Sequence, residues 1–173
     1  MLNVDTQIFK DTYFKFNHLL NNNILSTENF WKKITAELKN ENKYEELMKF
    51  IKGLPTHEIN EQMLELVDRL KNNGYKTGLL SNNTVEAANK VRGVGLIDHF
   101  DTVVVSAEIG YSKPHPKAFE IFIERLGVVV KELIYIDDTE RSLVASKEVG
   151  FYPVLFTDYE SLLNTLTKLG VKT

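Results

Sequence analysis

The hydrophobic and polar positions of this chain follow one rhythm up to about residue 52 and another after Pro55. In the front stretch, apolar residues recur at three- and four-residue spacing, which places them on one face of a helix. An asparagine run at 21–23 interrupts the pattern, and Ser26 resembles the start of a second helix. The pattern predicts no strand here, so residues 1–56 are expected to form a small helical subdomain. The two apolar stripes comprise Phe9, Tyr13, Phe16 and Leu20, and then Phe30, Trp31, Ile34 and Leu38.

Helical and strand patterns alternate after Pro55. Such alternation is typical of right-handed βαβ units, which build a parallel sheet covered by helices. Residues 57–173 are therefore expected to form an α/β core. The expected helices span 58–72, 84–91, 116–126, 140–149 and 161–169, and the expected strands span 76–80, 101–106, 133–136 and 153–156.

Composition narrows the class of protein. The chain has 173 residues, of which 43% are hydrophobic and 26% charged, as in an ordinary globular protein with one core and a small subdomain. A net charge of -3 gives no basis for binding nucleic acid or an acidic membrane. The absence of cysteine excludes disulfides and thiolate chemistry and fits a cytoplasmic location. No apolar run approaches the roughly 20 residues of a membrane span.

Polar side chains follow three of the expected strands. Ser81 and Asn82 follow the first, Lys113 lies beyond the second, and Asp137 and Asp138 end the third. Ligands of open α/β sheets bind at the carboxyl ends of the strands, so we expect these groups to meet in one crevice. The hydroxyl and the ammonium suit a phosphoryl group, and the adjacent carboxylates suit Mg²⁺.

Each signal also has a plainer interpretation. Ser81 or Asn82 could cap the following helix, and Lys113 could be a solvated loop lysine. The acidic pair is harder to explain this way, because a helix cap needs only one carboxylate. His115 is interpreted as a surface histidine. The aromatic residues of the front segment are expected to form its core, although some could face the crevice and select a substrate.

Together, and in this order, these motifs resemble those of the haloacid dehalogenase (HAD) superfamily of hydrolases. Residues 79–83 resemble its second motif, whose Ser or Thr binds phosphate, with Ser81 in that place. Residues 110–116 resemble the third, and Lys113 would steady nucleophile and phosphate. Residues 134–138 resemble the fourth, whose acids hold Mg²⁺, with Asp138 the direct ligand. The response-regulator receiver domain uses similar residues, but in the reverse order.

The resemblance implies a Rossmann-like three-layer α/β sandwich with a helical cap, and it departs from the family at the front. Members begin with a central strand that ends in Asp-x-Asp, whose first Asp attacks phosphorus. Asp5 does not match that Asp, because Gln7 stands where the second would be. The first strand is thus expected to be missing or truncated. N-terminal residues, shifted strands, upstream residues, or a partner chain in a homodimer or strand exchange would have to fill its place.

The function implied by the resemblance is a magnesium-dependent phosphatase of small phosphorylated metabolites. Without a nucleophile, this sequence is expected to be inactive or nearly so. The alternative is a non-catalytic, phosphate-binding regulatory module. A 2-haloacid dehalogenase is less favoured, because dehalogenation requires no metal and the acidic pair suits one.

Overall fold

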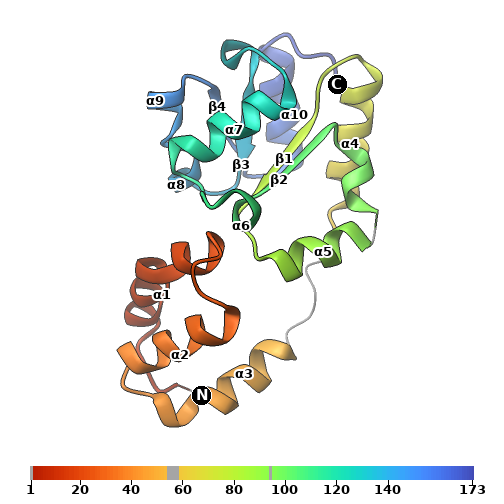
Figure 1. Cartoon of the computed structure of the whole chain (residues 1–173). Helices are drawn as coiled ribbons and strands as arrows, with labels where there is room; N and C mark the ends of the chain where they lie inside the picture. Colours follow the sequence, from red (N-terminus) through yellow and green to blue (C-terminus); the bar gives the residue numbers. More distant parts are fainter. Residues whose placement is uncertain (1, 54–58, 94) are drawn as a thin grey trace.

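Three helices form the cap in the computed structural model, which describes residues 2–53, 59–93 and 95–173 (Figure 1). Side chains of Asp5 and Ser26 accept hydrogen bonds from first-turn amides of α1 and α2, so the caps fix where these helices begin. Phe30 is fully buried and packs edge-on against Tyr13 and Trp31, which are half-buried, so the aromatic cluster of the cap is centred on Phe30. The elements are α1 (Thr6–Asn21), α2 (Thr27–Glu37), η1 (Glu41–Lys43) and α3 (Tyr44–Lys52).

Helices and strands alternate in the core as the sequence predicts. Gly127 closes α7 in the left-handed conformation, at the position expected from the sequence. The elements are α4 (Glu61–Asn72), β1 (Gly78–Ser81), α5 (Val85–Gly93), η2 (Leu96–His99), β2 (Thr102–Val105), α6 (Ser106–Ile109), α7 (Pro116–Leu126), η3 (Val130–Glu132), β3 (Ile134–Asp137), α8 (Glu140–Leu143), α9 (Ser146–Val149), β4 (Tyr152–Leu155) and α10 (Tyr159–Lys168).

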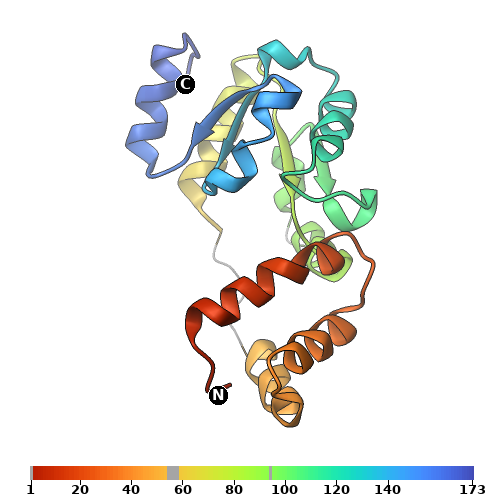
Figure 2. The same cartoon turned by 90° about the vertical axis from the view of Figure 1, so that its left-hand side faces the viewer.

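Helices cover both faces of the strands, which confirms the three-layer α/β architecture (Figure 2). On one face, Leu80 and Tyr135 pack with Phe119 of α7. On the other, Ile136 packs with Leu66 of α4 and with side chains of α10. Successive residues of β3 thus serve opposite layers, as the period of a strand requires.

The parallel strands form two pairs in the described part of the chain. One pair joins β1 to β2, with Ser81 beside Val105, and the other joins β3 to β4, with Asp137 beside Leu155. No ladder joins β1 to β3, and none of the described residues before Gly78 forms a strand. In the described part of the chain, the two pairs are therefore separate two-stranded sheets.

The continuous helix expected over 140–149 is wrong: α8 and α9 are separate short helices. Val144 and Ala145 lie between them, and their carbonyls accept from the amides of Lys147 and Glu148 of α9, three residues on, which tightens the backbone. The boundary expected at residue 56 between cap and core lies outside the described residues, as does His57.

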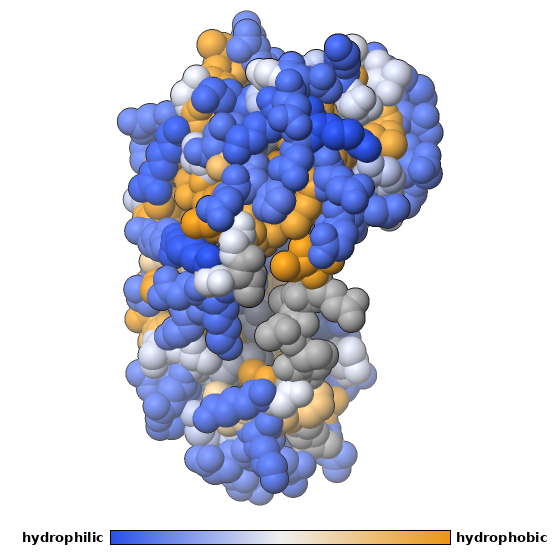
Figure 3. All heavy atoms as spheres, turned by 90° about the vertical axis from the view of Figure 1, so that its right-hand side faces the viewer, coloured by the Kyte–Doolittle hydropathy of each residue, from blue (hydrophilic) through white to orange (hydrophobic). Residues whose placement is uncertain are grey.

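The cap lies beside the carboxyl ends of the strands, with α1 packed against α6 (Figures 1 and 2). The space-filling view shows a largely hydrophilic surface that narrows between core and cap (Figure 3). Within the described ranges, every helix is too short or too polar to traverse a lipid bilayer.

Candidate functional site: a pocket between cap and core

A pocket of about 780 Å³ lies between α1 and the carboxyl ends of the strands. The side chains predicted to meet at the strand ends all line it. The sequence therefore predicted correctly that the three loops converge. The core contributes Ser81, Asn82, Ser112, Lys113, Pro114, His115, Pro116, Asp137, Asp138, Thr139, Arg141 and Ser142, and α1 with the residue after it contributes Tyr13, Phe14, Asn17, His18, Asn21 and Asn22.

An ion pair between Lys113 and Asp137 forms the floor of the pocket. The Lys113 Nζ lies 2.6 Å from Asp137 Oδ2, and the side chains are only 12% and 7% exposed. The other oxygen of Asp137 accepts a hydrogen bond of 2.9 Å from the Thr139 amide. A carboxylate buried to this degree needs such partners to offset its desolvation. The lysine is therefore not a solvated loop residue.

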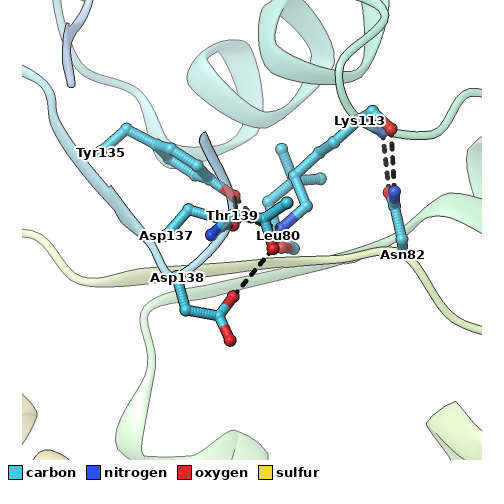
Figure 4. A network of polar contacts seen from close by, with 7 residues as sticks. All are labelled: Leu80, Asn82, Lys113, Tyr135, Asp137, Asp138 and Thr139. Atoms are coloured by element: carbon cyan, nitrogen blue, oxygen red, sulfur yellow. Dashed lines mark hydrogen bonds and ion pairs between the residues drawn. The ribbon is translucent and has the colours of Figure 1, made fainter. Parts of the chain in front are cut away.

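Asn82 holds Lys113 in place through the backbone (Figure 4). Its Nδ2 donates to the Lys113 carbonyl at 2.9 Å, and its Oδ1 accepts from the Lys113 amide at 2.7 Å. Both ends of the side-chain amide are thus used within the protein. Asn82, which the sequence suggested as a substrate contact, fixes the lysine loop against the end of β1 in this structure.

Helix capping does not account for Ser81 or the acidic pair. The hydroxyl that accepts from the first turn of α5 belongs to Thr84, which bonds the Ala87 amide at 3.2 Å. The residue before α8 is Thr139, and no side chain caps that helix. The plainer interpretations of these residues are therefore not what the structure shows.

Asp138 has a more open environment than its neighbour. It is exposed, and its Oδ1 accepts a hydrogen bond of 3.1 Å from the Thr139 hydroxyl. Among the residues described, no cluster of three or more acidic or histidine side chains could enclose a metal. Two carboxylates nevertheless fit Mg²⁺, which commonly takes one or two protein carboxylates and completes its shell with water and phosphate.

Tyr135 joins the two strand pairs through its hydroxyl, a role that the apolar pattern of the strand does not predict. Its hydroxyl lies 3.4 Å from the Leu80 carbonyl on β1 and 3.5 Å from Asp137 Oδ2 (Figure 4). Burial, together with the Asp137 carboxylate, raises the pKa of Tyr135, so the phenol stays protonated and can donate. Its ring packs edge-on against Phe119. An apolar strand pattern predicts burial of this ring but not the target of its hydroxyl.

Residues of α1 form the cap side of the pocket. Tyr13 is one of the aromatic residues expected to be able to face the crevice, and it does. His18 lines the pocket as well. The spacing of these residues in the sequence could have predicted that they act together, because Phe14, His18 and Asn21 lie on one face of α1. His115 is exposed, and its Nδ1 accepts from the Lys117 amide at the start of α7.

A family model described as "Haloacid dehalogenase-like hydrolase" matches residues 7–156. This chain belongs to that family. Among solved structures, the chain is similar to a predicted HAD-like hydrolase from Porphyromonas gingivalis, with a TM-score of 0.67, 19% identity, and 98% and 92% of the two chains covered. It is also similar to a HAD family enzyme from Bacteroides thetaiotaomicron, solved as an aspartate-to-alanine variant with magnesium and inorganic phosphate. That likeness has a TM-score of 0.63 and 20% identity, with 92% of each chain covered.

Curated relatives of this HAD-like chain include several hydrolases. Rat bifunctional epoxide hydrolase 2 is 26% identical over 125 residues, which cover 69% of this chain and 23% of that protein. Pyrophosphatase PpaX of Bacillus velezensis is 32% identical over 93 residues, covering 52% and 42%. Glyceraldehyde 3-phosphate phosphatase of Pyrococcus furiosus is 34% identical over 90 residues, covering 51% and 38%. The matched regions thus span less than half of these relatives.

Proposed function

We propose that this chain binds small phosphorylated metabolites in the pocket, within the magnesium-dependent phosphatase line of its family. One observation supports this above all: the ammonium of Lys113, the hydroxyl of Ser81 and two carboxylates converge at the same strand ends. The first two groups can donate to phosphoryl oxygens. The relatives named as phosphatases support the same substrate class.

Asp138 and Asp137 are the residues that would hold magnesium. Asp138 is exposed toward the pocket, whereas Asp137 is already bonded to Lys113 and the Thr139 amide. When bound, the ion would neutralise negative charge on a phosphoryl group. Lys113 and Ser81 would orient that group, and Asn82 would keep the lysine loop in position.

A non-catalytic, phosphate-binding role is the second candidate. The carboxylates that line the described pocket are Asp137 and Asp138, and both are assigned above to the metal. In the mechanism that the family resemblance implies, a further Asp carboxylate attacks phosphorus. We therefore expect hydrolysis by the polypeptide of residues 1–173 to be near the uncatalysed rate.

Calorimetric titration with inorganic phosphate, with and without Mg²⁺, tests the binding site. Lys113→Ala should weaken phosphate binding about ten-fold or more, because a hydrogen bond to a charged group is lost. Lys117→Ala is the matched control: this exposed lysine of α7 pairs with Glu120 outside the pocket and should leave binding unchanged.

Asp138→Asn provides a variant that does not disturb the buried ion pair. Mg²⁺ should strengthen phosphate binding by the wild type but not by this variant. The proposed site would be contradicted if phosphate affinity changed neither with Mg²⁺ nor in the Lys113→Ala and Asp138→Asn variants. Hydrolysis of p-nitrophenyl phosphate well above the rates of Lys113→Ala and Asp138→Asn would instead reject the non-catalytic role.

A further inference from the structure

Arg141 is a charged group of the pocket that the proposed phosphate site does not use. It belongs to α8, three residues beyond Asp138, and its side chain is exposed at the pocket. No salt bridge or side-chain hydrogen bond engages its guanidinium within the described ranges, whereas Lys113 is paired with Asp137. An arginine presents a planar fork of donors that matches a carboxylate or a phosphate.

The cap holds this guanidinium in position. The Arg141 Cζ lies 5.7 Å from the centre of the Phe14 ring, a cation–π contact between core and α1. Phe14 is 49% exposed, so part of its ring is accessible to the guanidinium. Stacking on an aromatic face limits the freedom of the arginine without consuming its hydrogen-bond donors.

The surroundings favour a second anion over a neutral group. The side chains that α1 turns toward the pocket carry no carboxylate and include Tyr13, Asn17 and Asn21. The pocket measures about 780 Å³, far more than a phosphate ion occupies, so a ligand anchored at Lys113 has room to extend. The two acidic residues of the pocket, Asp137 and Asp138, are assigned to the proposed metal, and Arg141 is a pocket cation with no carboxylate partner among the described residues.

We propose that the pocket selects phosphate esters that carry a second anionic group, and that Arg141 binds this group. The inference rests on the proposed phosphate site and narrows its substrate class. Phosphorylated carboxylates and bisphosphates share the required chemistry. Phosphate esters with an uncharged tail would lack a partner for Arg141 and bind more weakly.

Calorimetry with four probe ligands in Mg²⁺ buffer tests the inference. They are inorganic phosphate, glycerol 1-phosphate, 2-phosphoglycolate and propane-1,3-diol bisphosphate. The last two should bind the wild type about ten-fold or more tightly than glycerol 1-phosphate, since each gains a charge-assisted pair. A gain for only one of them identifies the second anion as a carboxylate or as a phosphate.

Arg141→Gln should remove the tighter binding of the two-anion ligands and leave the affinity for glycerol 1-phosphate unchanged. Arg141→Lys should keep part of the tighter binding. Arg125→Gln, at an exposed arginine of α7 outside this pocket, should change no affinity. The side chain of Arg141 is exposed, so the variants should fold, which circular dichroism checks.

These experiments distinguish a failure of the proposed role of Arg141 from a failure of the proposed phosphate site. Equal affinities for one-anion and two-anion ligands, or a uniform loss in Arg141→Gln, would overturn the role of Arg141 while the phosphate site stands. Failure of inorganic phosphate and all three esters to bind the wild type would refute the phosphate site and this inference with it.

Discussion

Tyr135 shows how much one side chain contributes to this site. Its ring is buried on the α7 face, while its hydroxyl reaches both the carboxylate of Asp137 and the Leu80 carbonyl on the other strand pair. The Lys113 Nζ also lies 5.6 Å from the ring centre. A single residue thus connects the ion pair of the pocket to the packing of the core.

Replacing Tyr135 with phenylalanine should lower the free energy of unfolding by about 1 kcal/mol, because one hydrogen-bond donor is lost while the aromatic packing remains. Urea denaturation followed by circular dichroism measures the change. Tyr152→Phe is the control, since Tyr152 is a half-exposed tyrosine of β4. A loss no larger in Tyr135→Phe than in Tyr152→Phe would contradict the structural role of the hydroxyl.

At the scale of elements, the packing of β1 against α7 sets the position of Ser81 and Asn82. Gly78 begins β1, and a Cβ there would lie 2.6 Å from Phe122 Cζ and 2.7 Å from Cε2. Phe122 is 2% exposed and belongs to the core cluster, so it has little room to move. The strand approaches the helix closely because its first residue has no side chain.

Gly78→Ala should therefore lower the free energy of unfolding by about 1–3 kcal/mol, the usual effect of overpacking a core. Thermal or urea unfolding measures it. Gly93→Ala is the matched control, because a Cβ at Gly93, the last residue of α5, meets nothing within 4 Å. Comparable stability of the two variants would show that the β1–α7 contact adjusts without strain.

At the scale of the whole molecule, the separation of the two strand pairs is the main irregularity. The inner edges of β1 and β3 form no ladder with each other in the described part of the chain. Unpaired strand edges favour association with another chain. The far edge of the second pair is protected, because β4 contains Pro153, and proline disrupts edge pairing.

We expect the polypeptide of residues 1–173 to self-associate through these inner edges, giving a species of twice its 19.9 kDa mass. Light scattering across a concentration series measures this, and hydrogen exchange locates the protected amides. Exchange should slow in β1 and β3 on association. A monomer at every concentration, with both inner edges already protected, would contradict the expectation.

The sequence by itself determined the alternation of elements, the helical front segment and the polar residues at the strand ends. These follow from local rules, because periodicity reports which face of an element is apolar, and an apolar run that ends in Ser or Asp marks the end of a buried strand. The family motifs at Ser81, Lys113 and Asp137–Asp138 were therefore recognisable before the fold was known.

Only the tertiary structure decided what these groups touch. Lys113 pairs with Asp137 across 24 residues of sequence, and Asn82 holds the lysine loop across 31. The stacking of Arg141 on Phe14 depends on where the cap lies against the core. Such contacts depend on how distant elements pack and how side chains are directed, which local periodicity does not specify.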